Sequence, residues 1–292
     1  MLSKWIDHKN KLAVRELTPT NRTESTGGVK AILKREPMQK PFVHRVGGVL
    51  SADIAVPDHD RELDFYTRVL TTGDSPLWRD DLMNNLGMPV IGLGARTPEY
   101  SELPLQWMPH FQVADVAASA GSAIDLGGKE LMHSKTDDGQ SQWAVLEDQF
   151  GAGFGVIPVV AEESNATQQS QRLGCISWLS LTTPDAPSSR DFYQRVVGWN
   201  AKSIDAADNQ GEAVAGFEMQ IEEAISAAEI NQFCEKHNPF PAVWLIHLPV
   251  GDFQESLRLV GEAGGEVIKE FAESKHAIVR DPVGVHFALR AG

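Results

Sequence analysis

The sequence predicts an α+β protein built from two tandem copies of one unit. Four times along its 292 residues, an apolar strand-like run is followed closely by an Asp, a helix-length stretch and a Gly. An Asp side chain can accept the free backbone N–H groups of a helix's first turn, and Gly readily adopts the left-handed conformation that ends a helix. We therefore interpret each unit as a strand that leads into a capped helix. The runs are Val49–Val56, Trp107–Val113, Ile176–Thr183 and Val243–Val250, the caps are Asp58, Asp115, Asp185 and Asp252, and the glycines are Gly73, Gly127, Gly198 and Gly264.

The four units pair into two copies of a larger one. Matched residues in the two halves lie at nearly constant separations, and the changes in separation fall between the matched words, as insertions in loops would place them. The separations are 127 residues for Asp58/Asp185 and Phe65/Phe192, 137 for Trp107/Trp244, Asp115/Asp252 and Gly127/Gly264, and 133 for Asp148/Asp281.

Composition along the chain predicts the domain boundaries. Residues 1–47 form a basic N-terminal extension, and a first domain follows over 48–160. The polar stretch 161–172 has the composition of a linker, and a second domain fills 173–292. The length agrees with about two domains.

Short β-type runs follow the helices and complete each unit as strand, helix and strands. An additional helix is expected over Gln220–Glu235, in the ten-residue insertion that raises the separation from 127 to 137. The β-type runs are Pro89–Leu93, Trp143–Glu147, Phe154–Val159, His276–Arg280 and Val285–Leu289.

Charge and composition exclude several classes of function. The net charge is −14, and since residues 1–47 carry ten Lys/Arg against four Asp/Glu, residues 48–292 carry −20. Binding to nucleic acid needs a basic surface that contacts the phosphates, so a segment as acidic as residues 48–292 excludes nucleic acid as an expected partner. No apolar run approaches the roughly 20 residues that span a bilayer, and the N-terminus lacks the apolar segment of a secretory signal, so we expect a cytoplasmic protein without a membrane partner. Cys175 and Cys234 provide neither a disulfide framework nor a cysteine metal site.

Several short sequence motifs of the second half resemble those of a known family. Asp191–Trp199, Trp244–Asp252, Ala263–Gly265 and Arg280–Gly284 resemble the vicinal oxygen chelate (VOC) superfamily, which includes glyoxalase I, bleomycin-resistance proteins, fosfomycin-resistance enzymes and extradiol dioxygenases. The resemblance implies tandem glyoxalase-like domains, each made of two βαβββ modules that form a half-open barrel around a concave cup.

The resemblance also implies where a divalent metal would be held: on the first strand of each module and on the last strand of the domain. His and carboxylate side chains are the ligands that suit Fe, Mn, Ni or Zn there. None occupies these places here, so no cofactor is expected at the usual family position. The six places fall on Ser51, Met108 and Gly155 in the first domain and on Trp178, Leu245 and Ala288 in the second.

A displaced set of polar residues lies two positions along each strand, where side chains return to the same face. Because neutral His can bind metal or act as a general acid or base, the candidate catalytic residues are Asp53, His110, His247 and His286. The other interpretation is that these are hydrogen-bonded core residues. Trp178 either stacks on a flat ligand or plugs the cup. The candidate ligand-binding residues are Ser51, Met108, Trp178, Ser180 and Leu245.

The leading hypothesis is a VOC-superfamily protein that binds a small organic molecule in one or both cups without the usual metal triad, for sequestration or for metal-free chemistry. The alternative is a metal-dependent glyoxalase-like lyase or isomerase, or an extradiol-type dioxygenase, that holds a divalent metal through displaced ligands. A third possibility is a scaffold whose cups are filled by side chains. Whether the protein is an enzyme, what its ligand is, the role of residues 1–47 and the oligomeric state stay open.

Overall fold

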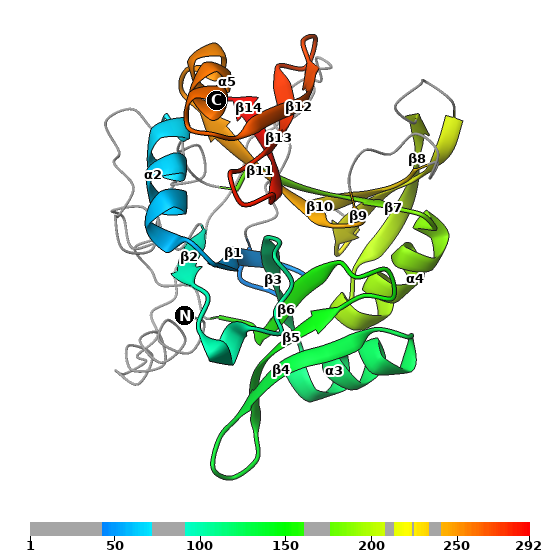
Figure 1. Cartoon of the computed structure of the whole chain (residues 1–292). Coiled ribbons are helices and arrows are strands. Elements are labelled where there is room, and N and C mark those ends of the chain that lie inside the picture. The colour runs from blue at the N-terminus through cyan, green and yellow to red at the C-terminus, as the bar shows by residue number, and fades with distance from the viewer. Residues whose placement is uncertain (1–42, 72–90, 161–175, 208–212, 224, 234–240) are drawn as a thin grey trace, which may run out of the picture. The chain divides into compact units, whose positions relative to one another are not determined.

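The computed structural model describes residues 43–71, 91–160, 176–207, 213–223, 225–233 and 241–292. They belong to one compact unit, Lys40–Gly292. They form two mixed sheets with helices packed on them, which confirms the predicted α+β class (Figure 1). Several predicted features lie outside the described residues: residues 1–42 of the N-terminal extension, Gly73, the linker 161–172, Cys175 and Cys234.

The first sheet has the strand order β2-β1-β3-β6-β5-β4, and α2 and α3 belong to the same half of the chain. Between α2 and β3, the described part of the first module contains one strand, β2. The elements are β1 (Val49–Val56), α2 (His59–Val69), β2 (Gly92–Ala95), the 3₁₀ turn η1 (Pro98–Tyr100), β3 (Met108–Val113), α3 (Val116–Asp125), β4 (Lys129–Lys135), β5 (Ser141–Glu147) and β6 (Gly153–Pro158).

The second sheet has the order β12-β13-β14-β11-β7-β10-β9-β8 and contains two complete βαβββ modules. The elements are β7 (Trp178–Thr183), α4 (Ala186–Val197), β8 (Asn200–Ala207), β9 (Ala213–Ile221), β10 (Ile225–Gln232), β11 (Trp244–Val250), α5 (Phe253–Glu262), β12 (Glu266–Phe271), β13 (His276–Arg280) and β14 (His286–Ala291).

All four predicted helix caps are confirmed. The side chain of each cap Asp accepts a hydrogen bond from the backbone N–H three residues later, which satisfies one of the free donors of the first turn. Gly198 ends α4 in the left-handed conformation with φ of 86°. Gly127 and Gly264 have φ of 87° just beyond α3 and α5, where a side chain would be strained.

The strands that begin the two modules of a half are neighbours within its sheet. β1 pairs antiparallel with β3, and β7 with β11. The last strand of a module returns parallel to its first, as in β3–β6, β7–β10 and β11–β14. This pairing brings the residues of two modules onto a common face.

The helices pack on one face of each sheet, and the other face carries the candidate site residues. Alternate residues such as Ile54, Phe111, Leu181 and Ile246 belong to the main hydrophobic core, which also contains the buried sides of the helices. The strand register places the intervening residues together on the opposite side. We call this side the helix-free face; it is defined by Ser51, Asp53, Met108, His110 and Gly155 in the first sheet and by Trp178, Ser180, Leu245, His247 and Ala288 in the second.

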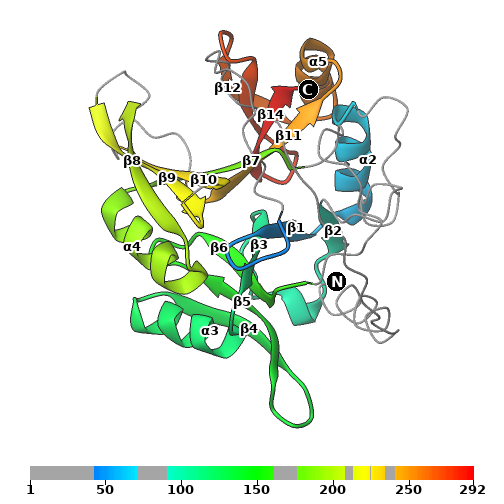
Figure 2. The ribbon, with the colours of Figure 1, turned by 180° about the vertical axis from the view of Figure 1, so that it is seen from behind.

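The helices of the two halves pair with each other. α2 contacts α5 and α3 contacts α4, and both pairs lie side by side in the two views (Figures 1 and 2). Each contact depends on a Gly that leaves room for a Phe of the other half. A Cβ on Gly265 would lie 2.8 Å from Phe65, and a Cβ on Gly128 would lie 3.1 Å from Phe192.

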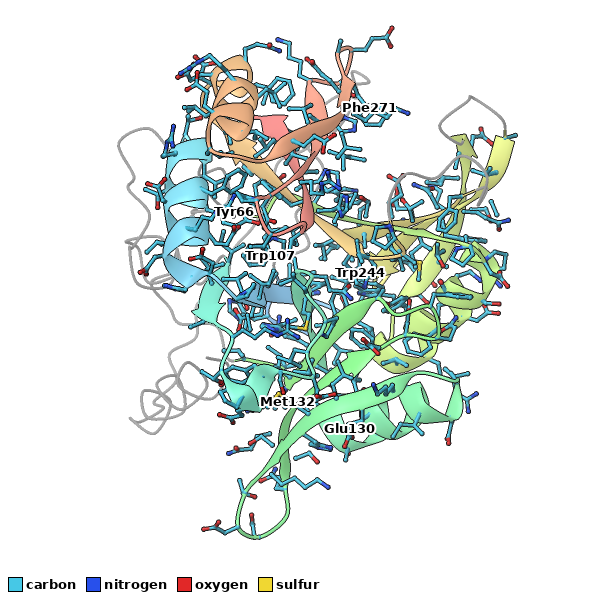
Figure 3. The ribbon with its side chains drawn as sticks, in the orientation of Figure 1. Tyr66, Trp107, Glu130, Met132, Trp244 and Phe271 are labelled. Atoms are coloured by element: carbon cyan, nitrogen blue, oxygen red, sulfur yellow. The ribbon has the colours of Figure 1, made fainter. Side chains whose placement is uncertain are left out.

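Two equivalent hydrogen-bond chains also join the halves. Trp107 donates to the Tyr66 hydroxyl at 3.0 Å, and this hydroxyl donates to Asp281 at 2.9 Å. Tyr66 and Trp107 lie close together beside α2 in Figure 3. The second chain consists of Trp244, Tyr193 and Asp148, with distances of 2.9 and 3.2 Å. The repeated side chains Phe65, Tyr66, Trp107, Phe192, Tyr193 and Trp244 are all buried.

The helix expected over Gln220–Glu235 is wrong. The segment contains the end of β9, a turn at Glu222 and Glu223, and β10. β10 pairs with β7 on one side and β9 on the other. These pairings and the burial of alternate apolar residues outweigh the weak helix preference of its Ala and Glu residues.

No helix in the described ranges is long and apolar enough to cross a membrane.

Candidate functional site

His110 is the centre of the candidate site in the first half. It lies on β3 and is 3 % exposed, and Gly155 on the neighbouring β6 leaves room for its ring: a Cβ on Gly155 would lie 2.5 Å from His110 Cδ2. Ser51 Oγ on β1 lies 2.8 Å from His110 Nδ1, within hydrogen-bonding distance. The candidate catalytic His110 and the candidate ligand-binding Ser51 are therefore directly bonded.

The second ring nitrogen of His110 has no hydrogen-bond partner although it is buried. Asp53 Oδ2 lies 3.9 Å from this Nε2, which is too long for a hydrogen bond. The Asp53 side chain is 18 % exposed, while that of His110 is 4 % exposed, so the carboxylate lies on the solvent side of the imidazole. Asp53 packs over Gly92, where a Cβ would lie 2.2 Å from its Oδ1.

Burial determines the charge of His110. Removal from water lowers the pKa of His110 to about 3, so its imidazole is neutral at physiological pH. The approach to Asp53 is therefore not an ion pair near neutral pH. A neutral imidazole offers one donor and one acceptor nitrogen, and the bond to Ser51 leaves Nε2 to face Asp53.

The second half has an equivalent but differently connected group. His247 on β11 is the repeat equivalent of His110, and its Nε2 lies 2.8 Å from Ser180 Oγ on β7. Burial, His276 and Arg290 lower the pKa of His247 to about 3. His110 is bonded through Nδ1 and His247 through Nε2, so the two halves present different imidazole atoms.

His276 belongs to this second group, although the sequence did not single it out. Its ring centre lies 6.2 Å from that of His247, and it stacks on Phe271 at 4.2 Å. The signal was present in the alternation of β13, because His276 lies two residues from Ile278 and thus on the helix-free face. His286 lies on this face of β14, two residues before Ala288, the partner of His247. Burial lowers the pKa of both His276 and His286.

The remaining predicted residues surround these groups. Met108 pairs with Asp53 in the register of β1 and β3, and Trp178 pairs with His247 in that of β7 and β11. Leu245 packs with Ile278 in a small apolar cluster, separate from the main core. The helix-free face of the second sheet therefore combines imidazoles with an apolar surface.

The side chains at the family's metal places do not fit a metal. Ser51 is bonded to His110, and the space beside Gly155 is filled by the His110 ring. In the second half, Trp178 and Leu245 have no ligand atoms suited to these metals. Across the part of the chain that the structure describes, no three His, Cys, Asp or Glu side chains come together as a possible metal site.

Comparisons with known proteins agree with this architecture. The family model of the glyoxalase-like domain matches residues 178–290, which include all of the second sheet except for Ala291. "Putative glyoxylase CFP32" of Mycobacterium tuberculosis is 24 % identical over 264 residues, which cover 86 % of this chain and 97 % of the relative. The anthracycline biosynthesis protein DnrV of Streptomyces peucetius is 26 % identical over 129 residues, or 40 % of this chain and 46 % of DnrV.

A solved structure supports the fold of both halves. BphC, a halotolerant catechol dioxygenase, superimposes with a TM-score of 0.50 and 12 % identity, covering 86 % of this chain and 88 % of BphC. At this identity the likeness concerns the fold alone. Residues 178–290 therefore match a glyoxalase-like domain, and the repeated modules together with the likeness to BphC show that both halves of the chain share this fold.

Proposed function

We propose that the protein binds a small organic molecule that carries a hydroxyl group, at the His110 site and without a metal at the usual family position. The observation that carries this proposal is the buried Nε2 of His110, which has no partner. A buried polar atom without a partner costs about 1–3 kcal/mol. A ligand that supplies the missing partner removes this cost.

The geometry favours a hydroxyl. When the Ser51 hydroxyl donates to Nδ1, the hydrogen of the neutral ring lies on Nε2 and faces Asp53. The separation of 3.9 Å between Nε2 and Asp53 Oδ2 suits one bridging oxygen at about 2.8 Å from each. A hydroxyl can accept from the ring and donate to the carboxylate at once, whereas a carbonyl oxygen cannot do both.

This arrangement also defines what chemistry is within reach. Asp53 is placed to accept a proton from the bridging hydroxyl, and His110 is placed to donate a hydrogen bond to its oxygen. Alcohols, phenols and enols are the compounds that such a pair recognises. The Ser180–His247 group is a second candidate position, and it would contact a ligand through a different ring nitrogen.

Catechol is a suitable probe, because it is a small aromatic diol and the structural neighbour BphC is a catechol dioxygenase. The protein, purified without nickel resin, is titrated with catechol by calorimetry in EDTA. We expect saturable binding that weakens at least tenfold in His110→Ala and Asp53→Asn. His133→Ala is the control, since His133 bonds Glu130 and Ser141 on β4 and β5, away from the site.

The same titration tests the alternative. If catechol binds only after Fe²⁺ or Mn²⁺ is added, or if Fe²⁺ elicits oxygen consumption that His110→Ala abolishes, the metal-dependent function replaces the proposed one. Absence of binding by catechol, phenol and an aliphatic diol in both conditions would overturn the proposed ligand class. Equal binding by wild type and His110→Ala would move the ligand away from His110.

A further inference from the structure

Helix α2 contains a fully buried acid that the candidate site does not use. Glu62 has 0 % exposed surface, and neither carboxyl oxygen has a hydrogen-bond partner. An ionised carboxylate in such a place would be a buried charge without compensation, which proteins avoid by keeping the group protonated.

The group that faces Glu62 is another carboxyl. Asp281, in the turn between β13 and β14, lies within hydrogen-bonding reach of Glu62 and is itself 3 % exposed. Two carboxylates cannot bond to each other, since both only accept. One proton held between them resolves both problems, because the protonated carboxyl then donates to the ionised one.

The surroundings assign this proton to Glu62. Asp281 accepts the Tyr66 hydroxyl at 2.9 Å and the backbone N–H groups of Val283 and Val285 at 3.1 and 2.7 Å, and these donors stabilise its charged form. Besides Asp281 and Tyr66, the titratable groups whose charges act on Glu62 are Asp58 and Arg61, with opposite effects. Burial and the charge of Asp281 raise the pKa of Glu62 to about 8.

The second half contains the same network without the acid. Asp148 accepts from the hydroxyl of Tyr193 and from the backbone N–H groups of Phe150 and Ala152. At the position of Glu62 this half has Ser189, 127 residues later, and its hydroxyl bonds to Thr183 at 3.0 Å. The network is therefore complete without a second carboxyl, and Glu62 is an addition to the first half.

We propose that Glu62 and Asp281 hold one proton between them in the folded protein, and that this proton keeps α2 closed against the last module. The contact includes Tyr66–Asp281 and the packing of Phe65 on Phe287 at 6.2 Å. When the proton leaves, two adjacent buried carboxylates repel each other within this contact. The pair thus acts as a proton-dependent latch between the first and last modules.

The sign of the pH dependence follows from the pKa of Glu62. Since this pKa rises from 4.5 to about 8 on folding, the folded state binds more protons than the unfolded state between these values. The unfolding equilibrium constant therefore rises with pH, by up to tenfold per pH unit for one group, and levels off above about pH 8. The histidines whose pKa values fall on folding act in the opposite direction up to about pH 7.5, because their unfolded forms still bind part of a proton there, so the contribution of Glu62 is the difference between the wild type and a variant that lacks this acid.

Urea unfolding between pH 6.5 and 8 tests the latch. We expect the ratio of the wild-type unfolding constant to that of Glu62→Gln to rise across this range, because the amide keeps the shape of the protonated acid and does not titrate. Asp148→Asn and Ser189→Ala are the matched controls from the second half; both should be less stable than the wild type and keep its pH slope. A wild-type slope that persists in Glu62→Gln would overturn the proposal.

Hydrogen exchange of the native protein provides an independent test that needs no variant. Helix α4 is the repeat equivalent of α2 and serves as the internal reference for the intrinsic pH dependence of exchange. We expect the protection of α2 relative to α4 to fall several-fold between pH 7 and pH 9. An unchanged ratio would show that the proton does not control the contact.

Discussion

The hydroxyl of Tyr66 lies 2.9 Å from Asp281 Oδ2 and links the first helix of the described chain to the turn before its last strand. The reciprocal bond joins Tyr193 to Asp148. In each case the Tyr belongs to one half and the Asp to the other. The repeated sequence motifs therefore supply the residues that form the contact between the two halves. The two halves pack against each other as the subunits of a symmetric dimer would.

Replacing either tyrosine with Phe tests this reciprocity. Tyr66→Phe leaves Trp107 Nε1 without its acceptor and Asp281 without one donor, and Tyr193→Phe does the same to Trp244 and Asp148. We expect each variant to lose about 1–3 kcal/mol of unfolding free energy, the usual cost of an unsatisfied buried group. Urea unfolding at pH 7 measures both. A loss in one variant alone would show that the two contacts are not energetically equivalent.

The glycines beneath the Phe side chains give a second prediction. A Cβ on Gly265 would lie 2.7 Å from the Arg280 carbonyl oxygen, and one on Gly128 would lie 2.5 Å from that of Glu147, so neither fits without a backbone shift. We expect Gly265→Ala and Gly128→Ala to lose about 1–3 kcal/mol, as overpacked sites do.

The control for these variants is Gly121→Ala in α3. Nothing lies within 4 Å of a Cβ at this position, and Ala is favoured over Gly inside a helix by about 0.5–1 kcal/mol. We therefore expect a gain in stability, measured under the same conditions. Equal effects at all three positions would contradict the steric explanation.

Local signals explain which parts of the fold could be predicted from the sequence. Capping residues and alternation act over a few residues, so the predicted bounds of Val49–Val56 and His276–Arg280 coincide with β1 and β13. The hairpin of β9 and β10 was missed because its pairing partners lie elsewhere in the chain. Constant separations identified Phe65 and Asp281 as repeated positions, but they do not say whether the adjacent Tyr66 bonds the Asp of its own half or that of the other half.

The candidate site was predictable to the same degree. Alternation along the strands correctly brought Asp53 and His110 to one face. The bond between Ser51 and His110 depends on the pairing register of β1 and β3, which the alternation along either strand alone does not reveal. The mismatch between Glu62 and Ser189 is visible in the sequence, yet its meaning depends on which helix face meets the other half.

Metal removal should not affect the folded protein. Because Ser51, Met108 and Trp178 supply no metal ligands at the family's places, we expect dialysis against EDTA to leave the melting temperature unchanged. Elemental analysis of protein purified without nickel resin should find Mn, Fe, Ni and Zn far below one atom per chain. Stoichiometric metal that is lost in the double variant Asp53→Ala/His110→Ala would contradict this prediction and indicate displaced ligands.

The neutral imidazole of His110 predicts how the protein responds to acid. Its pKa falls from 6.5 to about 3 on folding, so below pH 6.5 the unfolded state binds a proton that the folded state does not. The stabilising contribution is complete about one pH unit above 6.5 and is lost as the pH falls toward 3. For this group the loss is at most about 1.4 kcal/mol per pH unit.

Urea unfolding of His110→Gln between pH 6.5 and 5 isolates this contribution, because Gln keeps a polar side chain that does not titrate. We expect the variant to be less stable than the wild type at pH 7 but to lose stability more slowly on acidification, by about one proton's slope. Ser51→Ala is the matched control: it removes the bond to Nδ1 and leaves the imidazole, so it should lower stability and keep the wild-type slope. If His110→Gln and the wild type lose stability in parallel, His110 is already protonated in the folded protein, and an ion pair with Asp53 would then replace the hydroxyl-binding geometry.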